Sequence, residues 1–182
     1  MFKLGLRVGE LCALKWEDIN ETAEEIHIHR MESKDEKGRE GRHSQVVEYT
    51  KKKSPYGDRF LPIGDYEKWI FAKVKAINKA YGYDSEFIFC DENGRTNIRS
   101  IDNRIRKCCK RAGIDVKSAH DIRRTVASEM FNNGVPVEII RNFLGHSDIK
   151  TTYGYILDNK KKEDTCRMIH NTLSSMNGLK IS

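Results

Sequence analysis

The sequence predicts an α+β fold that is mainly α: a helical domain with a small three-stranded antiparallel sheet. Two patterns predict it. Most of the chain after residue 63 repeats its apolar residues at intervals of three and four, as amphipathic helices do. Between residues 24 and 63, short alternating stretches are bounded by charged or Pro/Gly-containing segments, as strands are. With 182 residues, 38% of them hydrophobic, the chain is expected to form one domain around a single core.

The first third of the chain supplies one helix and the three strands. Residues 5–19 place apolar side chains at roughly helical spacing, which predicts the helix. Residues 24–30 alternate and predict the first strand, and the charged, glycine-containing residues 31–44 predict a loop. Residues 45–53 and 58–63 predict two further strands, which form a hairpin with each other across a Pro/Gly turn.

Six helices are predicted in the remainder, each from apolar spacing combined with start or stop residues. They are expected at residues 64–82, 97–113, 119–133, 136–145, 147–156 and 158–175. Pro136 lies in the first turn of its helix and Gly145 ends it, while Ser147 is a good N-cap for the helix that follows.

Composition narrows the function. The formal net charge of +6 makes a polyanion a plausible partner, and basic residues crowd the helix at 97–113 and the turn before it. The five cysteines are odd in number and show no CxxC spacing, so they are expected to be reduced thiols. No apolar run approaches the roughly 18 residues of a membrane-spanning helix.

Residues 120–156 hold an unusual concentration of ionisable side chains. His120 and Arg123, three residues apart, share one helical face and can converge on one small anion. His146 directly follows Gly145, so it is expected on a turn rather than inside a helix. Tyr155 follows nine residues later, and Tyr153 points to a different side.

These residues resemble a known family. "HDIRRT…LGHSDIKTTYGY" is similar to the C-terminal signature of the tyrosine recombinases (phage-integrase family): H-x-x-R, then L-G-H, then T-T-x-x-Y. "GLRVGELCALKWEDIN" resembles the other arginine box of that family, and "VVEYTKKKSPYGDRFLPI" resembles its lysine-bearing hairpin, which ends in R-x-x-P-L. The three boxes stand in the family's order, and the resemblance runs from Gly5 to about Ile156. It implies the tyrosine recombinase catalytic fold.

The resemblance implies six catalytic residues: Arg7, Lys51, His120, Arg123, His146 and Tyr155. The lysine stays open, because the "VVEYTK" register favours Lys51 whereas counting back from Arg59 favours Lys53. Arg124 stands where the family often has a second histidine, and Glu10 matches a frequent acidic residue behind the reacting groups.

The implied roles follow from phosphodiester chemistry. The two arginines clamp the phosphate oxygens, because planar guanidinium groups suit phosphate. Tyr155 attacks phosphorus and forms a 3′-phosphotyrosyl link, with His120 as base, His146 as a further donor and the lysine as acid for the departing 5′-oxygen. No metal or other cofactor is expected.

The resemblance also implies a domain organisation and partners. Residues 1–157 are expected to form the catalytic core, and residues 158–182 a C-terminal helix and tail that is a candidate protomer-exchange segment. The family's N-terminal core-binding domain is not visible in the sequence. Double-stranded DNA is the expected partner, with a homotetramer on DNA, a monomer or weak dimer when free, and a cytoplasmic, nucleoid-associated location in bacteria.

Two other functions remain open at this point. A type IB topoisomerase-like enzyme would use the same chemistry to relax DNA without a defined site. A non-cleaving DNA-binding protein would use the helices after Ala119 as a reader and would never form a covalent link.

Overall fold

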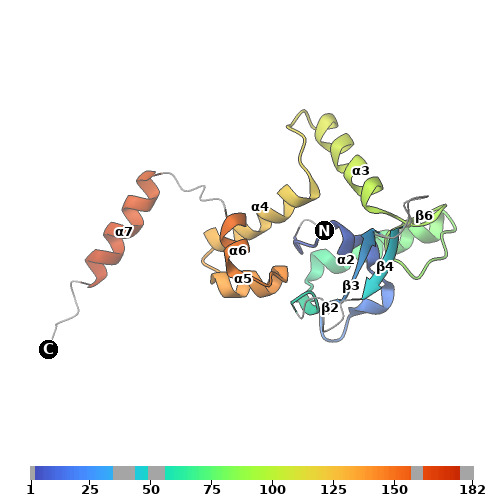
Figure 1. Cartoon of the computed structure of the whole chain (residues 1–182), viewed down its shortest axis with the longest axis horizontal. Coiled ribbons are helices and arrows are strands. Elements are labelled where there is room, and N and C mark those ends of the chain that lie inside the picture. Colours follow the sequence, from blue (N-terminus) through green and yellow to red (C-terminus); the bar gives the residue numbers. More distant parts are fainter. Residues whose placement is uncertain (1–2, 35–43, 49–55, 157–161, 177–182) are drawn as a thin grey trace.

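The structure is a computed structural model, and it describes residues 3–34, 44–48, 56–156 and 162–176. Seven α-helices, one 3-10 helix and seven short strands are found in these ranges (Figure 1). The α-helices are α1 (Val8–Ala13), α2 (Asp65–Ala80), α3 (Ile98–Arg111), α4 (Ala119–Asn132), α5 (Val137–Leu144), α6 (Ile149–Tyr155) and α7 (Lys162–Met176). The mainly helical α+β class predicted from the sequence is confirmed.

The strands form three small antiparallel sheets. They are β1 (Ile19–Asn20), β2 (Glu25–Ile28), β3 (Arg30–Lys34), β4 (Ser44–Glu48), β5 (Arg59–Pro62), β6 (Cys90–Asp91) and β7 (Gly94–Arg95). One sheet has three strands in the order β1-β2-β5, β3 pairs with β4, and β6 pairs with β7.

The predicted strand pairing was wrong. The described part of the strand expected at 45–53, β4, pairs with β3 and not with the strand at 58–63, and β5 pairs with β2. The first residues of the predicted loop at 31–44 belong to β3. The physical reason is that burial alternates without a break from β2 into β3, but the buried positions in β3 are Arg30 and Glu32. Because these two are charged, the apolar alternation that marks a strand stops at Ile28.

The helices follow the predicted order, with differences at several ends, among them Pro136, which is the N-cap of α5 and not part of its first turn. The helix expected at 5–19 is only α1, and a separate 3-10 turn (Trp16–Asp18) follows it. The N-cap of α6 is Asp148, whose side chain accepts a hydrogen bond from the Lys150 amide, so the prediction of Ser147 was wrong by one residue. Both are good capping residues.

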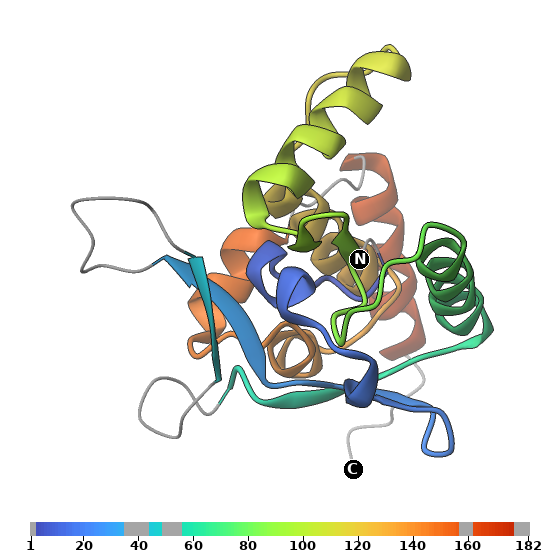
Figure 2. The ribbon, with the colours of Figure 1, turned by 90° about the vertical axis from the view of Figure 1, so that its right-hand side faces the viewer.

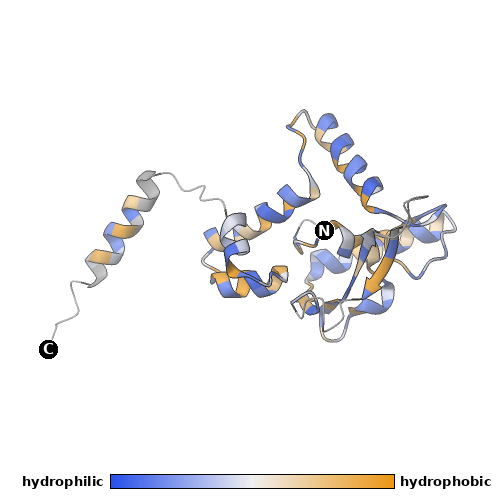
Figure 3. Cartoon of the chain, viewed as in Figure 1, coloured by the Kyte–Doolittle hydropathy of each residue, from blue (hydrophilic) through white to orange (hydrophobic). Residues whose placement is uncertain are grey.

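Two apolar clusters hold the structure together. In the first, Leu11 of α1 packs with Ile26 and Ile28 of β2 and Leu61 of β5. The second joins α4 and α5 through Ala127, Ile140 and Leu144. Phe143 of α5 packs against both clusters. In Figure 2, α1 (blue) lies near the centre of the molecule, between the strands and helices α3 and α4. Figure 3 shows that α5 is rich in apolar residues, whereas α3 is largely hydrophilic.

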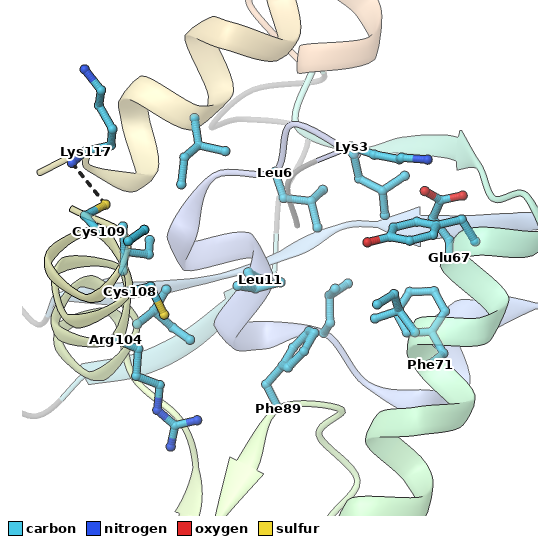
Figure 4. Close-up of a pocket in the computed structure, with 18 of the residues that line it drawn as sticks. Lys3, Leu6, Leu11, Glu67, Phe71, Phe89, Arg104, Cys108, Cys109 and Lys117 are labelled. Carbon is cyan, nitrogen blue, oxygen red and sulfur yellow. Dashed lines mark hydrogen bonds between the residues drawn. The ribbon is translucent and has the colours of Figure 1, made fainter. Parts of the chain in front are cut away.

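An apolar cavity of about 740 Å³ lies between α1, α2 and α3. Leu11, Phe71 and Cys109 reach it from these three helices (Figure 4). None of the predicted catalytic residues that the structure describes lines this cavity. Helix α7 stands clear of the rest of the described chain in Figure 1, with Ile169 and Leu173 exposed. No helix in the described ranges is long and apolar enough to cross a membrane.

Candidate active site

Three arginines from distant parts of the chain surround the buried carboxylate of Glu10. Arg7, just before α1, donates from Nη1 to Glu10 Oε1 at 2.7 Å. Arg59, at the start of β5, donates from Nη1 and Nη2 to the two carboxylate oxygens at 3.1 and 3.0 Å. Arg123 of α4 places Nη1 4.0 Å from Glu10 Oε2. Glu10 has no exposed surface, so its charge is shielded from water and acts strongly on all three guanidinium groups.

The pKa values of Glu10 and Arg123 reflect both their burial and the charges around them. Burial alone would raise the pKa of Glu10, but Arg59, Arg7 and Arg123 together lower it from 4.5 to about 2. Burial lowers the pKa of Arg123 to about 10, and repulsion by Arg7 and Arg59 acts in the same direction. Glu10 and Arg123 are therefore both charged at neutral pH, and three arginines around one carboxylate give the cluster an excess of positive charge.

The same arginines bind three consecutive carbonyl groups at the end of α5. Arg59 Nε donates to Phe143 O at 2.7 Å, Arg123 Nη2 donates to Leu144 O, and Arg7 Nη2 donates to Gly145 O at 2.7 Å. The last carbonyl groups of a helix lack partners within the helix and carry partial negative charge, so they suit cationic donors. The end of α5 thus sets the spacing of the three guanidinium groups.

Gly145 is required by this arrangement for two reasons. Its φ of +68° lies in the left-handed region that residues other than glycine rarely adopt. A Cβ atom at this position would lie 2.5 Å from Tyr56 O and 3.0 Å from Arg59 Nη1. The chain just before β5 is therefore packed directly against the turn that carries His146.

His146 is buried beside the arginines. Its Nδ1 lies 3.0 Å from Thr152 Oγ1, and its Nε2 is buried with no hydrogen-bond partner among the described residues. Burial, followed by the positive charges of Arg123, Arg7 and Arg59, lowers the pKa of His146 from 6.5 to about 4. The imidazole is therefore neutral at pH 7, and one of its ring nitrogens remains available for a ligand.

Tyr155, the last residue of α6, completes the group. Its hydroxyl lies 3.3 Å from His120 Nδ1, and its ring meets the His146 ring edge-on with centroids 4.5 Å apart. The Arg123 guanidinium lies 5.9 Å from the centre of the tyrosine ring. The phenol thus lies beside one imidazole that can accept its proton and close to the positive charge of the cluster.

Two residues of α4 hold the backbone of the tyrosine helix. Arg124 Nη2 donates to Gly154 O at 3.1 Å, and the Ser128 hydroxyl lies 3.3 Å from Tyr155 O as well as 3.0 Å from Arg124 O in its own helix. Tyr153, by contrast, is 57% exposed. Of the two tyrosines, only Tyr155 lies among the candidate catalytic groups.

Five of the six residues predicted to be catalytic, all except the lysine, therefore lie together: Arg7, His120, Arg123, His146 and Tyr155. Lys51 and the alternative Lys53 lie outside the described residues. The strands on either side of residues 49–55 are described: Glu48 of β4 pairs with Arg30, and Arg59 of β5 pairs with Ile28.

Sequence reasoning assigned no role to Arg59 or Thr152, although both carry contacts of the site. The signals were present: Arg59 is the arginine of the R-x-x-P-L pattern, and Thr152 is the second threonine of T-T-x-x-Y. Arg124, noted only as a departure from the family pattern, holds the tyrosine helix.

The basic residues near α3 divide into two groups. Arg95 forms an ion pair with buried Glu32, at 2.6 Å, and is only partly exposed. The exposed members of the group are Arg99, Arg104, Arg106, Lys107, Lys110 and Arg111.

The fold and site together define a class of protein: a helical domain that gathers guanidinium and imidazole groups around a phenol. The sequence model of the phage integrase family matches residues 1–162, and the chain belongs to that family. The chain is 30% identical over 177 residues to a XerC-like tyrosine recombinase of Caldanaerobacter subterraneus subsp. tengcongensis, covering 88% of this chain and 45% of the relative. It is 28% identical over 172 residues to the ICEBs1 integrase of Bacillus subtilis, covering 89% and 45%. The chain thus spans about half the length of these curated relatives.

Solved structures share the fold. The XerA recombinase matches with a TM-score of 0.69 and 22% identity, covering 94% of this chain and 53% of that one. The Tn1549 transposon integrase, solved in complex with transposon right end DNA, matches with a TM-score of 0.75 and 19% identity, covering 95% and 56%. At these identities the likeness concerns the fold alone.

Proposed function

We propose that this chain carries out site-specific DNA recombination, in integration or excision, by cleaving and rejoining DNA strands through a 3′-phosphotyrosyl intermediate. One observation carries the proposal. Nε2 of His146 is buried beside guanidinium groups and has no hydrogen-bond partner among the described residues, and the His146 ring packs against the ring of Tyr155. The guanidinium groups gathered around this nitrogen suit an anion with several acceptor oxygens, and a phosphate diester is such a group.

The reaction uses each group in a defined step. Tyr155 Oη attacks phosphorus, its proton passes to His120, and the bond from phosphorus to the 5′-oxygen breaks. Arg7, Arg123 and His146 bind the non-bridging oxygens, on which negative charge grows in the transition state. Removing one such donor typically costs about 10²- to 10³-fold in rate. Because the phosphotyrosyl bond keeps the energy of the broken bond, the 5′-hydroxyl of another strand can reverse the step.

The departing 5′-oxygen needs a proton, and a lysine of the 49–55 segment is the proposed acid. The described neighbours of this segment support the placement, since Tyr56 O packs against Gly145, next to His146. Lys51 and Lys53 are compared by replacing each with alanine. On a substrate whose 5′-oxygen is replaced by sulfur, which leaves without an acid, only the variant of the true acid recovers activity.

The proposed partner is double-stranded DNA, and the exposed basic residues of α3 support backbone contacts to it. We further propose that residues 1–157 are the catalytic core of a longer protein, that a tetramer forms on DNA, and that the free chain is a monomer or weak dimer in the bacterial cytoplasm. The exposed Ile169 and Leu173 on α7 support a C-terminal segment that packs against a neighbouring copy or its own body. Deleting residues after Leu157 tests this, because an unchanged solution mass and unchanged packing contradict it.

The decisive experiment uses a nicked suicide DNA duplex from which the cleaved fragment diffuses away. A protein–DNA adduct that survives denaturant is expected with the unchanged chain and with Tyr153→Phe, but not with Tyr155→Phe. An adduct lost with Tyr153→Phe but kept with Tyr155→Phe refutes the nucleophile assignment.

The same assay separates the two alternatives. A non-cleaving DNA-binding protein forms no adduct with any variant, and its affinity is indifferent to Tyr155→Phe. A topoisomerase-like enzyme forms the adduct on any duplex and relaxes supercoiled DNA without a defined site, whereas a recombinase requires a particular core sequence.

A further inference from the structure

Among the described residues, the side chain of Thr152 makes one polar contact, with the ring of His146. It has no exposed surface, and its hydroxyl lies 3.0 Å from Nδ1 of His146. Threonines within helices commonly donate to the carbonyl four residues earlier, as Thr125 does to Asp121 O at 3.0 Å. Thr152 makes no such bond within the described chain, so His146 Nδ1 is the available acceptor for its hydroxyl hydrogen.

The contact allows two arrangements of protons. If Nδ1 carried the hydrogen, it would donate to the threonine, and the threonine hydroxyl hydrogen would be buried without an acceptor. If the threonine donates, Nδ1 is unprotonated and the hydrogen of the neutral imidazole must lie on Nε2. The first arrangement leaves two groups unsatisfied, the threonine hydrogen and the Nε2 lone pair. The second leaves one, the hydrogen on Nε2, which lies buried beside the arginines without a partner in the described residues.

We propose that Thr152 is a positioning residue: its hydroxyl donates to Nδ1 and so fixes His146 in the tautomer that carries its hydrogen on Nε2. His146 then presents a hydrogen-bond donor to whatever lies between Arg7 and Arg123. An acceptor nitrogen at the same place would repel a phosphate oxygen through its lone pair.

The consequence for the reaction rests on the proposed function. With its hydrogen on Nε2, His146 binds a non-bridging phosphate oxygen and cannot act as the base for Tyr155. The base is then His120, whose Nδ1 lies 3.3 Å from the tyrosine hydroxyl. Thr152 thereby separates the roles of the two histidines.

The tautomer is measured directly on the DNA-free chain by nitrogen-15 NMR, because protonated and unprotonated ring nitrogens resonate far apart. The His146 signals are assigned from their loss in His146→Gln. At pH 7 the unchanged chain is expected to show Nδ1 unprotonated and Nε2 protonated, and Thr152→Ser is expected to show the same. A protonated Nδ1 in the unchanged chain overturns the proposal.

Thr152→Val removes the hydroxyl at nearly constant volume, and Thr151→Val is the matched control, since Thr151 is its exposed neighbour. The valine at 152 is expected to move the Nδ1 resonance and to slow adduct formation on the suicide duplex about tenfold, the value of one hydrogen bond. Thr152→Ser restores both readouts, and Thr151→Val changes neither. His146 resonances in Thr152→Val identical to those of the unchanged chain also overturn the proposal. If no variant forms an adduct, the proposed function fails while the resonances still decide the tautomer.

Discussion

Replacing Glu10 with glutamine is expected to be strongly destabilising, because it removes the carboxylate charge that balances three guanidinium groups, those of buried Arg59 and Arg123 and of partly exposed Arg7. The carboxylate meets Arg7 and Arg59 directly and lies 4.0 Å from Arg123. These contacts lower its pKa from 4.5 to about 2. One pKa unit corresponds to about 1.4 kcal/mol, so the ionised form stabilises the folded state by about 3 kcal/mol relative to a neutral side chain.

The sign of the pH dependence follows from the lowered pKa. The stabilisation is complete above pH 4.5, where the unfolded chain is also ionised, and is lost as the pH falls toward 2. The difference between the unchanged chain and Glu10→Gln should therefore shrink from about 3 kcal/mol at pH 7 by about 2 kcal/mol at pH 3. Urea unfolding followed by circular dichroism at both pH values measures it.

The control is Glu17→Gln. Glu17 also accepts a hydrogen bond from an arginine, Arg30, at 2.8 Å, but its side chain is 66% exposed. Water screens such a pair, so its loss should change the stability by about 0.5 kcal/mol or less. A cost below about 1 kcal/mol for Glu10→Gln, or one that does not depend on pH, would refute the reasoning that buried charge balance holds the site together.

Three further predictions concern neighbouring positions. Gly145→Ala should cost about 3 kcal/mol in urea unfolding, more than Gly113→Ala at about 1 kcal/mol, because both have a positive φ but only at Gly145 would the Cβ lie 2.5 Å from a backbone oxygen. Equal costs would contradict the crowding argument. The lowered pKa of His146 means that the unfolded chain binds more protons between pH 6.5 and 4, so stability should fall by about 1 to 2 kcal/mol from pH 7 to pH 5. His146→Gln should remove this loss, and a slope that persists in the variant counts against it. Arg59→Met should lower the free energy of unfolding by about 3 kcal/mol. The double variant with Glu10→Gln should lose about 1 kcal/mol less than the sum of the two single losses, because the two side chains share one network. Additive costs would show that they act independently.

The order and type of the helices could be predicted from the sequence, because their apolar spacing and stop residues are local signals. The strand pairing could not. The buried face of β3 is made of Arg30 and Glu32, and these charges are tolerated only because Asp18 and Arg95 reach them from distant segments. The pattern of apolar and polar residues along one strand does not show which distant residues will pair with its charges.

The candidate site shows the same limit. Motif resemblance named Arg7, Arg123 and Tyr155, and the structure brings them together. It could not assign a task to Arg59 or Thr152, because what these side chains do depends on which groups face them across the fold. The contacts of Arg59 and Thr152 form only in the folded chain, where β5 meets the end of α5 and α6 packs beside α5.

The end of α5 explains why one short segment, "FLGH", carries so much of the site. Its helix must stop where three carbonyl oxygens can still turn toward the arginines, and a left-handed residue stops it there. The residue after the stop is His146, which is thereby placed where the charges of all three arginines act on its ring. Because the arginines bind backbone carbonyl groups as well as Glu10, their positions do not depend on a bound anion. Under the proposed function, the cluster is held in place before a phosphate binds, and preorganised charge of this kind lowers the free energy of a transition state.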